Sequence, residues 1–202
     1  MKNLVKIAAV AVLSLGFGVA AQAQGTPGNA SIQASAEVIS NVEVIGGLPL
    51  VFGQVMPGFN KFISLEGTAA DLSAGTVNST GVSQGSFYVS AAPGSSVILD
   101  FDLPVELADG AKKMEIVFNQ GLEEATNTIA WVTGTTLTAI PNNQIDGHLI
   151  PSFPQGEVNV GTDANPNNKN AITVFVGGMV KPTSTQASGS YVGTISLTAA
   201  YN

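Results

Sequence analysis

The chain has 202 residues, among them 23 glycines, 10 prolines, one histidine and no cysteine, and its formal net charge is −7. The lack of cysteine excludes disulfides, thiol nucleophiles and thiolate metal sites, and one histidine excludes a multi-histidine metal centre. All seven basic residues are lysines. An acidic chain without arginine is a poor match for nucleic acid, whose phosphates are bound by clustered positive charge.

Residues 1–23 have the pattern of a secretory signal peptide. Lys2 and Lys6 form a positive start, residues 7–20 are apolar, and Ala21-Gln22-Ala23 offers small side chains at the two positions that a signal peptidase requires. No later run is long and apolar enough to span a membrane, which takes about 20 residues. We therefore expect cleavage after residue 23 and export to the bacterial periplasm, the cell surface or the medium. The remainder would hold five lysines against 14 acids, a net charge of −9.

Strand signals dominate residues 30–202, which follow a flexible leader over residues 24–29. Apolar and polar residues alternate with a period of two, as in half-buried strands, and turn residues separate the runs. The pattern predicts an all-β fold, a single immunoglobulin-like or fimbrial-type antiparallel β-sandwich. Long loops are expected over residues 73–84 and 142–155. The expected strands cover residues 32–44, 48–55, 61–66, 86–91, 95–101, 114–118, 127–132, 135–139, 157–160, 172–176 and 191–201.

The first of these strands is the candidate assembly strand. Its apolar face consists of Ile32, Ala34, Ala36, Val38, Val42 and Val44. A strand of this kind, placed after a flexible leader, can pair within its own sheet or with the open edge of a neighbouring molecule. Insertion into a neighbour makes a head-to-tail contact that does not close, which builds a filament. The alternative is the first strand of a self-contained sandwich.

Few residues suggest chemistry. His148, the only imidazole base, is expected to be a solvated loop residue. Asp100 and Asp102 lie two apart on a strand and point to one face, where an outward polar surface is the simpler interpretation than a cation site. Residues 163–168 offer carboxylate and amide oxygens that suit Ca²⁺, although an Asx turn is the simpler interpretation. Trp131 is expected in the core rather than as a sugar-stacking platform. We expect no catalytic, metal-binding or cofactor-binding residue.

Several short segments together resemble a known family. They are Ala34-Ser35-Ala36-Glu37-Val38-Ile39, Leu50-Val51-Phe52-Gly53, Val97-Ile98-Leu99, Val176-Gly177-Gly178, Gly189-Ser190-Tyr191-Val192-Gly193-Thr194 and Ala200-Tyr201-Asn202. Their order and spacing resemble the bacterial secreted domain-of-unknown-function family 4402 and, more distantly, spore-coat-U-type and fimbrial subunit domains. The resemblance covers nearly all of the chain after the signal. It implies an exported surface β-sandwich without enzyme activity.

One departure leaves strand donation open. Fimbrial subunits of the chaperone–usher class often have a disulfide and lack one strand, whereas this chain has no cysteine and a full set of strand signals. The sequence favours an exported, non-catalytic structural or adhesive surface protein, a fibre or pilus-like subunit whose partners are copies of itself or other surface proteins. The alternative is a monomeric secreted module that binds a carbohydrate or another protein through residues 142–155 and 163–170. A hydrolase built on His148 ranks last.

Overall fold

The computed structural model of the chain describes residues 41–65, 69–71, 80–119, 127–133, 136–154 and 171–202. Within these ranges the regular structure is β, apart from one turn of 3-10 helix, η2 (Asn142–Gln144). Gly58, Gly94, Gly110 and Gly147 have positive φ in the turns, a conformation that L-residues with a Cβ seldom adopt. The predicted all-β antiparallel sandwich is confirmed.

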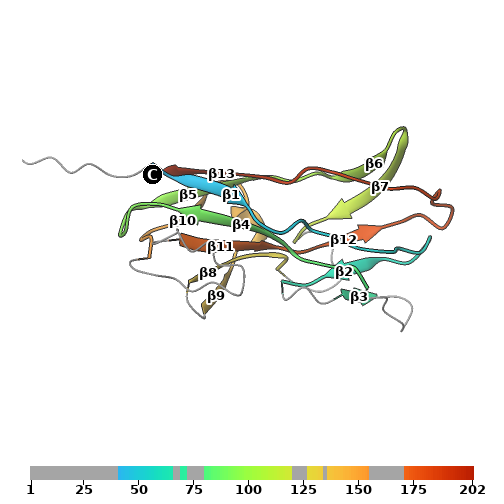
Figure 1. The fold of residues 1–202 in the computed structure, drawn as a ribbon, viewed down its shortest axis with the longest axis horizontal. Helices are drawn as coiled ribbons and strands as arrows, with labels where there is room; N and C mark the ends of the chain where they lie inside the picture. Colours follow the sequence, from blue (N-terminus) through green and yellow to red (C-terminus); the bar gives the residue numbers. More distant parts are fainter. Residues whose placement is uncertain (1–40, 66–68, 72–79, 120–126, 134–135, 155–170) are drawn as a thin grey trace, which may run out of the picture. The chain divides into compact units, whose positions relative to one another are not determined.

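The described strands form three sheets, in which all neighbouring strands are antiparallel (Figure 1). A five-stranded sheet has the order β1 (Glu43–Gly46), β4 (Gly85–Ser90), β11 (Ala171–Val176), β8 (Ile129–Thr133) and β9 (Thr136–Ala139). A three-stranded sheet consists of β10 (His148–Ile150), β5 (Val97–Asp102) and β13 (Ser196–Tyr201). A second five-stranded sheet has the order β3 (Ala69–Asp71), β2 (Lys61–Ile63), β12 (Gly178–Lys181), β7 (Lys112–Val117) and β6 (Glu106–Asp109).

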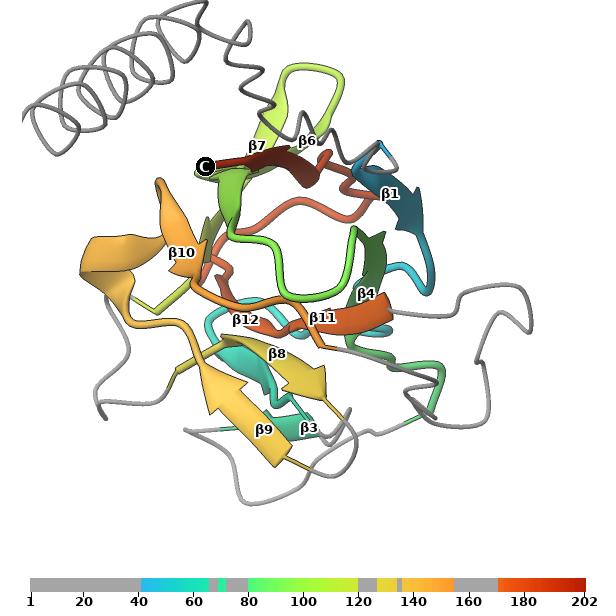
Figure 2. The same ribbon diagram turned by 90° about the vertical axis from the view of Figure 1, so that its left-hand side faces the viewer.

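Short connections join the sheet that contains β12 and β6 to both of the other sheets. Only Gly177 separates β11 from β12, and three residues separate β5 from β6. On the β13 side, Val192 forms an isolated bridge with Ala108 of β6, so the chain before β13 runs beside β6. Figure 2 shows β10 and β13 on one side of the molecule and β11 and β8 on the other.

Alternation along the strands places one core between the sheets. Along β5, Val97 and Leu99 are fully buried, while Asp100 and Asp102 are exposed. The same core contains Ile172 from β11 and residues from each of the three ladders. Burying one such aliphatic side chain contributes about 1.5–3 kcal/mol, so the inward faces of the long strands are the main stabilising feature.

Most expected strands are confirmed, with shorter ends. The expectation of a strand over residues 48–55 is wrong, because the segment forms only an isolated bridge between Val51 and Ser83. Pro49 lacks a backbone N–H for a ladder, and Gly53 has a φ of +63°. The expected loop over residues 142–155 is also wrong, because it holds η2 and β10. The final strand begins at Ser196, five residues later than expected. Strands β3, β6 and β12 were not predicted.

Other expectations lie outside the described residues. These are the signal peptide over residues 1–23, the leader over residues 24–29, the strand over residues 157–160 and the oxygen-rich segment over residues 163–168.

Candidate functional site

The candidate assembly strand enters the described fold at its last residues. Val42 and Val44 are half-buried against the core, whereas Asn41 and Glu43 are exposed, so the predicted alternation holds here. Ile32, Ala34, Ala36 and Val38 lie outside the described residues. Val44 belongs to β1, where it stands opposite the fully buried Val89 of β4. Among the described strands, β1 ends the order of its sheet. The outer side of an end strand presents backbone N–H and C=O groups that can pair with another strand.

The last strand, β13, is also at the end of its sheet in the described part of the chain. It pairs with β5 along its full length, from Ser196 opposite Asp102 to Tyr201 opposite Val97. The Tyr201 hydroxyl accepts a hydrogen bond of 2.9 Å from the backbone N–H of Ala92, in the turn that follows β4. This bond joins the end of β13 to the turn that follows β4, a strand of a different sheet.

His148 is not the solvated loop residue that the sequence predicted. It is 8% exposed and lies in β10, opposite Leu99 of β5. Pairing with β5 turns His148 and Ile150 inward and Leu149 outward. Its Nδ1 atom lies 3.2 Å from Oε1 of Gln144, and burial lowers the pKa of the imidazole below its ordinary 6.5. In the described ranges, no three His, Cys, Asp or Glu side chains gather in a way that could hold a metal ion.

The lowered pKa of His148 predicts an acid-side loss of stability. The unfolded chain takes up a proton as the pH falls through about 6.5, while the folded chain keeps the imidazole neutral to lower pH. The contribution of the neutral imidazole to the free energy of unfolding is complete above pH 6.5, and it is lost as the pH falls toward the pKa of the folded state. Urea denaturation at several pH values between about 7.5 and 5.5 measures it, above the range in which carboxylates titrate. We expect the free energy of unfolding to fall less with pH in His148→Gln than in the wild type. An equal fall in both proteins would show that His148 is not the group responsible.

Asp100 and Asp102 form the outward polar face that the sequence predicted. Both are exposed, and they stand opposite Thr198 and Ser196 of β13. Asp100 has an additional structural role, because its Oδ1 accepts a hydrogen bond of 2.6 Å from the backbone N–H of Gly147. This bond fixes the turn that leads into β10.

Trp131 packs against the core, as predicted. It is half-buried in β8, opposite Val174 of β11 and Thr138 of β9. Its Nε1 atom is buried without a hydrogen-bond partner. The indole therefore contributes apolar contact area in the sandwich.

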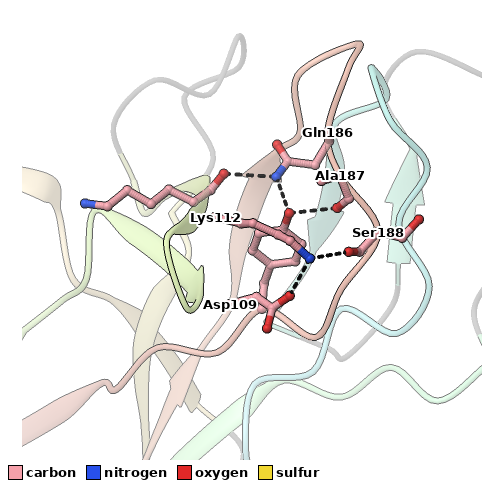
Figure 3. A network of polar contacts seen from close by, with 7 residues as sticks. Asp109, Lys112, Gln186, Ala187 and Ser188 are labelled. Carbon is pink, nitrogen blue, oxygen red and sulfur yellow. Dashed lines mark hydrogen bonds and ion pairs between the residues drawn. The ribbon is translucent and has the colours of Figure 1, made fainter.

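Sequence reasoning missed a polar latch, which we define as the hydrogen bonds of Gln186 and Ser188 with the β6–β7 hairpin, together with the Tyr191 hydroxyl that binds Gln186 (Figure 3). The side-chain Nε2 of Gln186 donates to the backbone carbonyl of Lys113 at 2.9 Å and to the Tyr191 hydroxyl at 2.7 Å. The Tyr191 hydroxyl donates to the carbonyl of Ala187 at 2.7 Å. No local pattern could reveal the latch, because its partners from the hairpin lie more than 70 residues away in the chain.

The latch continues at Lys112. Its Nζ atom lies 3.0 Å from Oδ2 of Asp109 and donates to the carbonyl of Ser188 at 2.8 Å. Gly189 permits this approach, since a Cβ there would lie within 3.0 Å of the Asp109 carboxylate. Together with the Ala108–Val192 bridge, these bonds hold the hairpin in one orientation against the chain that precedes β13.

No helix among the described residues is long and apolar enough to cross a membrane. Comparison with family models, with curated proteins and with solved structures finds no match to this chain. The resemblance to the secreted family therefore stays a prediction.

Proposed function

We propose that this chain is an exported, non-catalytic structural or adhesive surface protein that assembles with copies of itself through β-strand edges. The observation that carries the proposal is the continuity between the predicted assembly strand and β1. The alternating face that begins at Ile32 continues through Val42 and Val44, which pack on the core beside the sheet end. The acidic charge and the signal pattern support export to a surface or the medium.

The register of β1 shows how far β4 can pair with the chain that precedes β1. Glu43 stands opposite Ser90, the last residue of β4. Beyond Ser90 the chain turns at Pro93 and Gly94, and Gly94 has a φ of +73°. Strand β4 therefore offers no ladder to residues upstream of β1. An apolar face such as that of Ile32 to Val38 gains about 1.5–3 kcal/mol for each large side chain that it buries, which favours pairing with the edge of a neighbour.

Truncation tests the proposal. We compare residues 24–202 with residues 41–202, which retain β1 and its core contacts, by light scattering behind a sizing column and by electron microscopy. The longer chain is expected to assemble with increasing concentration, and the shorter chain to remain a monomer with an unchanged β-type circular dichroism spectrum. Removal of residues 24–29 alone is the control and should leave assembly unaffected.

Substitution within the segment sharpens the same test. Ala36→Glu places a charge on the apolar face, where burial in a neighbour would be costly, and Ser35→Glu places the same charge on the polar face. We expect the first to prevent assembly and the second to preserve it. Equal behaviour of the two variants would contradict pairing through this strand. A monomer at every concentration of residues 24–202 would favour the monomeric binding module, and glycan and protein ligands would then be screened.

A further inference from the structure

Strand β10 covers one edge of β5 with only three residues. His148 stands opposite Leu99 and Ile150 stands opposite Val97, and the side chains of His148 and Ile150 both face inward. Among the described strands β10 ends the order of its sheet, and β5 is its hydrogen-bonded neighbour. So short a ladder holds the strand weakly, and its attachment therefore depends on the contacts at its two ends.

The C-terminal end of β10 is attached by backbone bonds and a buried ring. Phe153 is 1% exposed, and its N–H donates to the carbonyl of Ser95 at 2.7 Å. The carbonyl of Phe153 accepts a hydrogen bond of 2.8 Å from the N–H of Gly94. At the N-terminal end, the described attachments use side chains instead. The carboxylate of Asp100 accepts from the N–H of Gly147, and the N-terminal end is therefore the one that releases first.

The second attachment at this end, the contact between Gln144 and His148, fixes which ring nitrogen carries the hydrogen. Oε1 of Gln144 lies 3.2 Å from Nδ1 and can only accept a hydrogen bond, so Nδ1 carries the hydrogen in the neutral ring. A second proton would go to Nε2, which has no hydrogen-bond partner among the described residues. Because the residue is 8% exposed, protonation would place a charge in an inward position without an acceptor for the new N–H.

The described elements beside β10 bring no charged side chain to the ring of His148. Asp100 and Asp102 of β5 are exposed on the outward face, and Asp146, in the turn before β10, is exposed as well. Lysine is absent from residues 85–104 and 136–154. Burial is what lowers the pKa of the imidazole below its ordinary 6.5. The folded arrangement therefore favours the neutral ring.

We propose that residues 142–150, which hold η2 and β10, form a proton-operated cover for the edge of β5. When His148 takes up a proton, the cover leaves the sheet and the ring reaches water, while Phe153 keeps the far end attached. The rest of the sheet persists, because β5 stays paired with all six residues of β13. An uncovered strand edge can pair with another strand, so acid would create a pairing edge here. The cover operates within one molecule and does not depend on the proposed assembly.

The register of β5 identifies the amides that report this opening. The backbone N–H of Asn202 donates to the carbonyl of Ser96, so the even-numbered residues of β5 bond to β13 and the odd-numbered residues face β10. The amide of Leu99 is therefore covered by β10, whereas the amides of Ile98 and Asp100 are covered by β13. Opening of the cover exposes the first amide and leaves the other two bonded.

Hydrogen exchange of residues 24–202, followed by NMR below the concentration at which the chain assembles, tests the proposal. Between about pH 7.5 and 5.5, we expect the protection factor of Leu99 to fall about three- to tenfold after correction for the intrinsic pH dependence of exchange, because the open form takes up the proton. Dilute urea should leave it unchanged, since a local opening exposes little surface. The amides of Ile98 and Asp100 should be better protected at both pH values and should respond to urea.

Two variants separate the trigger from the attachment. His148→Gln removes the titrating ring, so the pH dependence of Leu99 exchange should vanish. Asp100→Ala removes the acceptor of the Gly147 N–H, so the protection of Leu99 should be lower at both pH values and its pH dependence should remain. The wild-type series needs no variant to fold. Equal protection and equal urea response of Leu99 and Ile98, protection of Leu99 that is independent of pH, or an unaltered pH dependence in His148→Gln would each overturn the cover.

Discussion

Replacement of Gly177 by alanine is expected to lower the free energy of unfolding by about 3 kcal/mol. Gly177 is the single residue between β11 and β12, where the chain passes from one ladder to the next. A Cβ at this position would lie within 3.0 Å of the backbone carbonyl oxygen of Ile63, and a backbone atom in a paired strand cannot rotate away. The backbone N–H of Gly177 also donates to the carbonyl of Thr128 at 2.6 Å, which any shift of the chain would weaken.

Gly46→Ala is the matched control for this prediction. Gly46 also lies in a strand, and a Cβ there would have no neighbour within 4 Å. We expect its effect to stay within about 0.5 kcal/mol, as for a surface substitution. Urea denaturation followed by circular dichroism measures both. Similar stabilities of the two variants would show that the junction at Gly177 can relax, contrary to the expected close packing.

Replacement of Asn119 by alanine is expected to cost about 2–4 kcal/mol, because it leaves buried backbone groups without partners. The Asn119 side chain donates through Nδ2 to the carbonyl of Ile140 at 2.8 Å. Its Oδ1 atom accepts hydrogen bonds from the backbone N–H and the hydroxyl of Thr128, which is fully buried. These bonds connect the end of β7 to the start of β8 and therefore join two ladders.

Asn119→Gly separates the effect of the lost side-chain hydrogen bonds on the free energy of unfolding from the effect of backbone strain. Asn119 is the one described residue other than glycine with a positive φ, at 43°. Glycine removes the same hydrogen bonds but adopts this conformation readily, whereas alanine is strained there by about 1 kcal/mol. We expect both variants to be destabilised and the alanine variant more so. A stability of either variant equal to that of the wild type would show that the buried groups find other partners.

The strands that the sequence predicted well are those with a long alternating face. Along β5 and β11, every second residue is a large aliphatic or aromatic side chain, and each of these faces the core. In β5 the other face is polar at Asp100 and Asp102, so the inward side was determined before any partner strand was known. In β11 the other face, with Ala171 and Thr173, is buried as well. The turns at Gly58, Gly94 and Gly147 were equally local, because a positive φ requires glycine there.

The strands that the sequence missed depend on their neighbours. Strand β10 has only the residues His148, Leu149 and Ile150, and the chain around it resembles a loop. It forms because β5 offers a ladder, and that pairing is also what buries His148. Strand β12 likewise follows β11 after one glycine and pairs between β2 and β7. Short segments of this kind have no periodic signal of their own.

By itself, the sequence determined the all-β class, the inward faces of the long strands and the sites of the glycine turns, because alternation and backbone sterics act over a few neighbouring residues. Only the tertiary structure decided that Val44 lies on an end strand of its sheet. It also decided that Gln186 and Tyr191 hold the β6–β7 hairpin. These features follow from strand order and register between residues far apart in the chain, which local chemistry does not specify.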